Sequence, residues 1–217
     1  QFHTLKNKAI KVICPYSGAI LESHDSLLIN PGLPIFYRFK EREVFYLVVG
    51  RSATGFGKIF LYFPLSDYII TLQEGTWNGI NEFNQFKAKL ISQWNRYDKY
   101  INYRKPRKIA ILICASHFAH SLWNEVPSIP TIINFNYTKY IDKFIITEQP
   151  LGPFDKLFPE IEPNKIKLLS EQDAVSYLMK ENYFVIRIGS NYITENIVER
   201  IIVIQIKTEL KNTPCPS

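Results

Sequence analysis

Short apolar runs separated by turn residues dominate the first 80 residues of the chain. They predict strands at residues 9–14, 19–21, 27–29, 44–49, 58–63 and 68–72. Glycines at positions 50, 55 and 57 predict a hairpin loop between two of these strands. Because many short strands with frequent turns are typical of a meander or hairpin sheet, we expect a β-rich amino-terminal part.

The apolar pattern takes a longer period after residue 80. Apolar residues recur at spacings of three and four from Phe83 to Ile101, which predicts an amphipathic helix of about five turns. Further strands are predicted at residues 109–114, 143–147, 166–169 and 183–188, and helices at 117–126, 170–180 and 194–210. Pro127 and Pro130 are expected to end the first of these helices, and Ser170 is expected to cap the second.

The alternation of helices and buried strands favours an α/β fold with a Rossmann-like, mainly parallel sheet flanked by helices and a β-rich amino-terminal extension. We predict a β-rich subdomain at residues 1–80, a Rossmann-like domain at 81–211 and a linker at 212–217. The chain begins at Gln1 and its only methionine is Met179, so we expect a processed or trimmed amino terminus. The linker contains two prolines and is expected to lead to a second, carboxy-terminal domain.

The composition is that of a globular protein, with 46% hydrophobic and 21% charged residues. Cys14, Cys114 and Cys215 lie far apart, and the first two sit in apolar runs. This pattern predicts buried, reduced thiols and a reducing compartment. The sequence has no apolar run of about 18 residues that would span a membrane and no signal-peptide pattern at its start. We therefore predict a cytoplasmic location.

The net charge of +6 is concentrated most densely at residues 103–108. One interpretation is a solvated connection, with cations placed near a helix carboxyl terminus. The alternative is peripheral contact with the inner face of a membrane through Arg104, Lys105, Arg107 and Lys108. Because no nucleic-acid-binding signature accompanies the charge, nucleic acid is not an expected partner.

The helix predicted at residues 117–126 has an unusual polar face. At about 100° per residue, this face collects His117, His120, Ser121, Asn124 and Glu125. The opposite, apolar side, expected to pack on the sheet, consists of Phe118, Ala119, Leu122, Trp123 and Val126. The polar face holds no lysine or arginine, and it follows the carboxyl end of a buried strand, where open α/β sheets bind ligands. We predict a catalytic or ligand-contacting role for it.

Two other interpretations of this helix remain open. The first is an ordinary exposed helix face. The second is a metal site, since His117 and His120 have a spacing that can bring two imidazoles together. No HExxH pattern or cysteine partner supports the metal site, and His24 is the only plausible third imidazole. We therefore predict no metal.

A second candidate site lies at the end of the last predicted strand. Arg187 could bind a phosphate or carboxylate in a bidentate manner, and Ser190 precedes a helix whose first amides could add to it. A solvated strand end is the alternative for Arg187. Glu160 and Glu162 could form a carboxylate pair, although a solvated loop also explains them.

The stretch HFAHSLWNEVPSI at residues 117–129 resembles the motif of family 61-type glycosyltransferases and related bacterial polysaccharide-biosynthesis proteins. Its aromatic-plus-histidine element, hydrophobic pair, acid and proline are matched by Phe118, His120, Leu122, Trp123, Glu125 and Pro127. Residues 187–201 are similar in style to the segment that closes the amino-terminal half of such proteins. The resemblance covers about residues 108–205. Ser128 departs from it, because a basic residue often follows the proline in that family.

The resemblance implies a two-domain GT-B transferase that acts in the cleft between its domains. Its donor substrate would be a nucleotide-sugar, bound chiefly by the second domain. Its acceptor would be a glycan or a glycolipid, and the enzyme would need no cofactor. His120 or His117 would be the general base, with Glu125 as its orienting partner or the alternative base. Substrate contacts are expected from Asn124, Ser121, Arg187 and Ser190.

Two other functions compete with this hypothesis. One is a non-catalytic carbohydrate-binding or assembly module that presents the aromatic residues at 45–46, 60 and 62–63, although their alternation with aliphatic residues also predicts a core. The other is a metal-dependent hydrolase that uses His117 and His120.

Overall fold

The computed structural model describes residues 2–51, 56–73, 80–103, 105–189 and 193–212. Its helices are α1 (Phe2–Asn7), α2 (Ile80–Ser92), α3 (Trp94–Ile101), α4 (Phe118–His120), α5 (Ser128–Asn134), α6 (Phe154–Leu157), α7 (Glu171–Lys180) and α8 (Glu195–Asn212). Shorter turns of π or 3₁₀ helix are η2 (Ser121–Glu125), η3 (Tyr137–Tyr140) and η4 (Pro163–Lys165). The strands are β1 (Ile10–Ile13), β2 (Ile20–Ser23), β3 (Ser26–Leu28), β4 (Ile35–Lys40), β5 (Val44–Arg51), β6 (Phe56–Phe63), β7 (Tyr68–Gln73), β8 (Lys108–Ile113), β9 (Lys143–Ile146), β10 (Ile166–Leu168) and β11 (Tyr183–Ile186).

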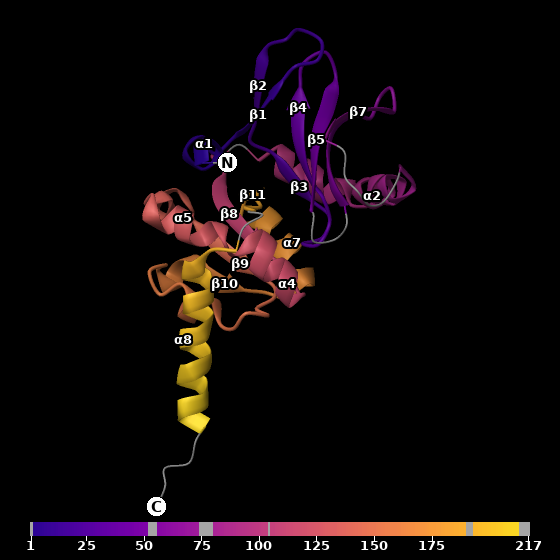
Figure 1. Cartoon of the computed structure of the whole chain (residues 1–217). Coiled ribbons are helices and arrows are strands. Elements are labelled where there is room, and N and C mark those ends of the chain that lie inside the picture. The colour runs from indigo at the N-terminus through magenta and orange to yellow at the C-terminus, as the bar shows by residue number, and fades with distance from the viewer. Residues whose placement is uncertain (1, 52–55, 74–79, 104, 190–192, 213–217) are drawn as a thin grey trace, which may run out of the picture.

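The largest sheet is antiparallel, so the prediction of a Rossmann-like, mainly parallel sheet is wrong. Five antiparallel strands lie in the order β3-β4-β5-β6-β7, and β1 and β2 form a separate antiparallel hairpin. Among the described strands, only β10-β9-β8-β11 form a parallel sheet. The short connections in the first part of the chain allow hairpins but not parallel crossovers. Figure 1 shows the antiparallel sheet above the parallel sheet and its helices.

Helix α2 packs on the antiparallel sheet through Phe83. The ring of Phe83 lies 4.9 Å from the rings of both Phe60 and Tyr62, and 6.3 Å from that of Phe36, measured between centroids. A single long helix was predicted here, but the structure has two, because the backbone of Gln93 leaves the helical region at φ −104° and ψ 11°. The edge-on aromatic contacts fix α2 against the sheet.

The parallel sheet is built as its apolar runs predict. Ile109 and Ile111 of β8 are fully buried, as expected for a parallel strand covered on both faces. Helix α7 begins at the predicted cap, where the Ser170 hydroxyl accepts a hydrogen bond from the Asp173 amide at 3.1 Å. The sheet order reverses at β8, because β9 and β10 lie on one side of it and β11 on the other.

Side chains from the amino-terminal half cover the outer edge of β11. The Tyr100 hydroxyl donates to the Tyr183 carbonyl at 2.8 Å, and the Tyr37 hydroxyl donates to the Val185 carbonyl at 3.1 Å. The Val185 amide donates to the Ser26 hydroxyl at 2.7 Å. Burial raises the pKa of Tyr37 and of Tyr100, which keeps both phenols protonated as donors. These bonds satisfy an edge strand that would otherwise expose its ladder groups, and they join the two sheets.

Helix α8 projects from the body of the molecule (Figure 1) and is attached near its start by Arg200. The Arg200 guanidinium donates to the Leu157 carbonyl at 2.7 Å and to the Glu160 carboxylate at 2.6 Å. It also lies over the Phe158 ring, 5.3 Å from the centroid. Glu160 is thus paired with a cation. Glu162 pairs with Lys165 at 3.4 Å, so the two glutamates do not form a carboxylate pair, which was one of the two interpretations of this segment.

Acidification is expected to loosen the attachment of α8. The hydrogen bonds from Arg200 hold the pKa of Glu160 below its ordinary value of 4.5. A depressed carboxyl pKa adds stability above the unfolded value, and this stability is lost as the pH falls through the folded value. The amide protection of α8, corrected for intrinsic exchange, should therefore fall as the pH is lowered below 4.5. Arg200→Gln should lower the protection at neutral pH as well. If the amides of α8 in the unaltered protein were equally protected at neutral and at acidic pH, the pair of Arg200 and Glu160 would not hold the helix.

In the described part of the chain, no helix combines the length and the apolar character needed to cross a membrane. The thiols of Cys14 and Cys114 are buried, as predicted for these two residues. Cys215 lies outside the described residues.

Candidate functional site

The segment after β8 contains a π-helical turn. Helix α4 leads directly into η2, in which the Val126 amide donates to the Ser121 carbonyl at 3.1 Å, five residues back. The helical segment ends at Glu125, just before Pro127, as predicted. A new helix, α5, begins at Ser128. Pro130 is the third residue of α5, where a backbone N–H would have no partner within the helix, so it does not act as a helix stop.

The π turn changes which side chains face the solvent. Ser121 and Glu125 are 2% and 3% exposed, whereas Phe118 and Trp123 are 49% and 52% exposed. Ser121 and Glu125 were expected to face the solvent, and Phe118 and Trp123 were expected to face the sheet. Both expectations are wrong. A regular step of about 100° per residue does not hold across a turn with five-residue hydrogen bonds.

The Glu125 carboxylate is directed into the protein and binds the end of β8. Its Oε2 atom accepts hydrogen bonds from the Cys114 amide at 3.0 Å and the Ala115 amide at 2.8 Å. Buried amides must find acceptors where a strand ends, and a carboxylate is a strong one. Glu125 therefore fixes the helix against the strand, which is a positioning role.

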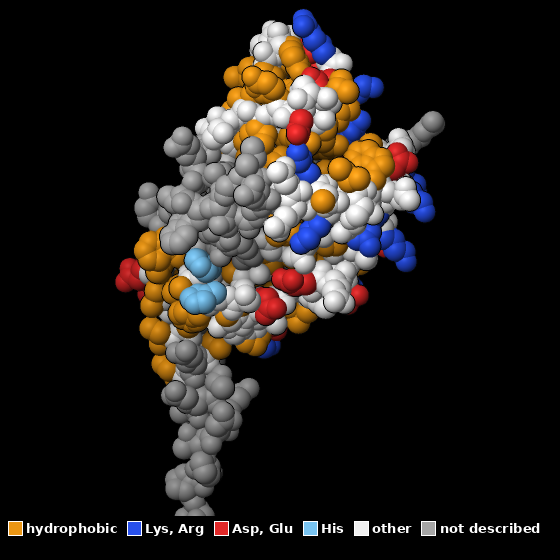
Figure 2. Space-filling model, turned by 90° about the vertical axis from the view of Figure 1, so that its right-hand side faces the viewer, with side chains coloured by type: hydrophobic (Ala, Val, Ile, Leu, Met, Phe, Trp, Pro, Cys, Tyr) orange, Lys and Arg blue, Asp and Glu red, His pale blue; other side chains and the backbone are white. Residues whose placement is uncertain are grey.

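His117 and His120 are both exposed, and their rings lie side by side with centroids 5.2 Å apart. The Nδ1 atom of His120 lies 3.3 Å from the Oδ1 atom of Asn124. When Nδ1 donates its proton to that amide oxygen, Nε2 of the same ring is left as a proton acceptor. Phe118 and Trp123, in the same helical segment, are exposed as well. We call these five residues the histidine surface. Figure 2 shows histidine side chains beside hydrophobic ones on the molecular surface.

The segment that follows β11 lies against the same helix. A Cβ atom at Gly189 would be 3.1 Å from the Asn124 carbonyl oxygen, so glycine permits this close approach. The carboxyl ends of β8 and β11 therefore meet beside the histidine surface. This is the point where the sheet order reverses, and ligands bind at such points in open sheets of parallel strands.

Arg187 is directed toward the antiparallel sheet. Its Nη2 atom donates to the carbonyls of Pro31 and Leu33, in the loop between β3 and β4. Its Nε and Nη1 atoms are buried, and no described residue accepts a hydrogen bond from them. The structure thus does not present Arg187 on the histidine surface, and Ser190 lies outside the described residues.

The basic segment at residues 103–108 is divided between the interior and the surface. Arg107 is 7% exposed and donates to the Asp25 carboxylate at 2.6 Å. Lys108 pairs with Glu181 at 3.2 Å. Lys105 is exposed, and Arg104 lies outside the described residues. Arg107 therefore stabilises the fold, and its guanidinium is not presented to a membrane surface.

The other candidate residues lie away from the histidine surface. The His24 carbonyl accepts a hydrogen bond from Arg107 at 3.3 Å, just before β8, whereas His117 follows the other end of that strand. Among the described residues, no group of three or more metal-ligating side chains comes together. The aromatic residues of β5 and β6 proposed as a partner surface are in the core: Phe45, Tyr46, Phe60, Tyr62 and Phe63 are all buried.

The exposure of Trp123 could not be predicted from the helical pattern, because it accompanies a π turn and a buried Glu125 that is bonded to the end of β8. His120 and Asn124 are four residues apart, a spacing that brings side chains together on a helix and could have indicated the hydrogen bond between them. No family model, curated protein or solved structure matches the chain, so its function is argued from this geometry.

Proposed function

We propose that the chain is the acceptor-side part of a glycosyltransferase that transfers a sugar from a nucleotide-sugar to a glycan or glycolipid. One observation carries the proposal: an exposed imidazole, His120, is oriented by Asn124 beside Trp123 at the carboxyl ends of the parallel strands. An oriented imidazole is suited to general base catalysis. An exposed indole offers an apolar face and a polar N–H to a ligand.

In this mechanism, Nε2 of His120 accepts the proton of an acceptor hydroxyl while the hydroxyl oxygen bonds to the anomeric carbon of the donor. The bond from that carbon to the diphosphate oxygen breaks, and the nucleoside diphosphate leaves with the electron pair. The Asn124 carbonyl oxygen holds the ring by its Nδ1 proton. His117, with its ring 5.2 Å away, contacts the acceptor, and Glu125 positions the helix from below.

The donor would bind chiefly to a second domain, as the resemblance to family 61-type enzymes implies. A cytoplasmic location, peripheral to the inner face of a membrane, would suit a glycolipid acceptor. Buried thiols at Cys14 and Cys114 support a reducing compartment. Lys105 is an exposed cation of the basic segment and could contact anionic lipid.

A non-catalytic carbohydrate-binding module is the second candidate, and the exposure of both Phe118 and Trp123 favours it. Two exposed aromatic rings next to polar side chains are suited to holding a sugar without reacting with it. In this alternative, Trp123 carries the binding and His120 contributes a hydrogen bond only.

The variant His120→Ala distinguishes the two functions. In full-length protein assayed with radiolabelled nucleotide-sugars and an oligosaccharide panel, it should lower transfer by a factor of about 100 or more, because the base is lost. Asn124→Ala should lower transfer less and shift its pH profile, because the ring remains. The control His3→Ala, on α1, should have no effect. Unchanged transfer in His120→Ala would refute the base. Binding of an oligosaccharide that depends on Trp123, with no transfer by any form, would favour the binding module.

A further inference from the structure

A basic pocket lies between α3 and α7, apart from the histidine surface. Its volume is about 560 Å³, within the range of small-molecule sites. It is lined by Asn95, Arg96, Lys99, Tyr100, Tyr103, Ser176, Met179 and Lys180. The lining from α7 belongs to the half of that helix that leads into the amino end of β11. The histidine surface lies instead at the carboxyl end of that sheet.

The described residues that line the pocket include three cations and no carboxylate. Arg96, Lys99 and Lys180 are all exposed at its rim. None of the ion pairs formed within the described part of the chain includes any of these three. The Arg96 guanidinium makes a 3.5 Å contact with Gln93, an uncharged partner. Like charges collected around a concave surface repel one another and attract an anion.

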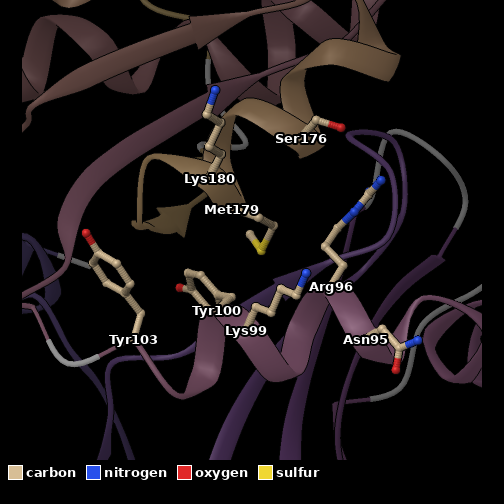
Figure 3. A pocket seen from close by; sticks show the side chains of 8 residues that line it. All are labelled: Asn95, Arg96, Lys99, Tyr100, Tyr103, Ser176, Met179 and Lys180. Carbon is tan, nitrogen blue, oxygen red and sulfur yellow. The ribbon is translucent and has the colours of Figure 1, made fainter.

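The floor of the pocket is apolar and rigid. Met179 is 7% exposed and Tyr100 is 3% exposed, and the Tyr100 hydroxyl is held by the Tyr183 carbonyl at 2.8 Å. In Figure 3 the side chains of Arg96 and Lys99 extend from α3 toward α7, with Met179 facing them from α7. A ligand in this space would meet cations at the rim and a thioether and an aromatic ring below.

We propose that this pocket binds a phosphate-bearing ligand whose apolar portion rests on Met179 and Tyr100. Phosphate matches the cations, because arginine binds its oxygens in a bidentate manner and lysine binds them as a point charge. The ligand is either a free phosphorylated metabolite or a lipid headgroup, since both carry this chemistry. The site is independent of sugar transfer at the histidine surface.

The test compares the protein with the triple variant Arg96→Gln, Lys99→Gln, Lys180→Gln. The altered side chains are exposed, so the fold should persist, and circular dichroism verifies it. A control variant, Lys89→Gln, Lys139→Gln, Lys156→Gln, removes the same charge from exposed positions outside the pocket. Calorimetric titration with inorganic pyrophosphate tests a free ligand. Flotation with vesicles of phosphatidylcholine, with or without phosphatidylglycerol, tests a headgroup.

Each outcome supports or overturns the proposal. Saturable pyrophosphate binding that weakens about tenfold or more in the pocket variant, but not in the control, supports a free ligand. Binding to phosphatidylglycerol vesicles alone, lost in the pocket variant and kept in the control, supports a headgroup. Binding to neither probe, or equal loss in both variants, overturns the site. Sugar transfer by the histidine surface is measured separately, so its failure would not count against the pocket.

Discussion

Arg107→Ala is expected to destabilise the protein by about 3–5 kcal/mol, measured by urea unfolding. The buried guanidinium donates to the Asp25 carboxylate at 2.6 Å, to the Tyr100 carbonyl at 2.8 Å and to the Asn182 side chain. It also lies over the Tyr100 ring, 3.8 Å from the centroid. Its removal leaves a largely buried carboxylate and amide without their main donor, at the junction of the two sheets.

Arg107→Lys should destabilise by an intermediate amount, because an ammonium group cannot reach partners in several directions as a guanidinium does. The exposed neighbour Lys105 is the matched control, and Lys105→Ala should change stability by less than about 0.5 kcal/mol. A loss for Arg107→Ala as small as that for Lys105→Ala would show that the guanidinium does not hold the junction.

Glu125→Ala is expected to cost about 2–4 kcal/mol, since it leaves the buried amides of Cys114 and Ala115 without their acceptor. The variant should also disturb the π turn, because the carboxylate holds η2 against the end of β8. Urea unfolding measures the first effect. The second should appear as altered NMR signals of the His117 and His120 imidazoles.

Glu125→Gln keeps one side-chain oxygen as an acceptor, so it should be milder, at about 1–2 kcal/mol. It should also leave the imidazole signals nearly unchanged. Glu148→Ala, at an exposed position, controls for the loss of a carboxylate. Full stability in Glu125→Ala would mean that water or another group satisfies the two amides, and the positioning role would be withdrawn.

Local patterns predicted the individual elements well. The apolar run of β8, the hairpin of β5 with β6 and the Ser170 cap of α7 were all predicted from neighbouring residues. Strand β4 was missed, because Arg38 and Lys40 interrupt its aromatic run. Pairing of strands depends on residues distant in sequence, so the local patterns did not show that the antiparallel sheet of the first part of the chain has more strands than the parallel one.

The histidine surface was predicted in part. The exposure of His117 and His120 follows from their polarity, but the burial of Glu125 does not. A helical wheel assumes regular turns, and the two amides that draw Glu125 inward belong to the strand end rather than to the helix. In the same way, nothing near Arg107 in sequence reveals that Asp25 will meet it. The sequence alone does not distinguish a buried arginine from an exposed one.

Binding of a sugar acceptor by the histidine surface can be measured by NMR titration of the protein with the oligosaccharide that binds it most strongly on a glycan array. We expect the imidazole signals of His117 and His120 and the indole signal of Trp123 to shift together and to saturate at one affinity. Trp123→Ala should abolish these shifts while the fold remains. Saturable shifts confined to other residues, or no oligosaccharide binding at all, would contradict acceptor binding at the histidine surface.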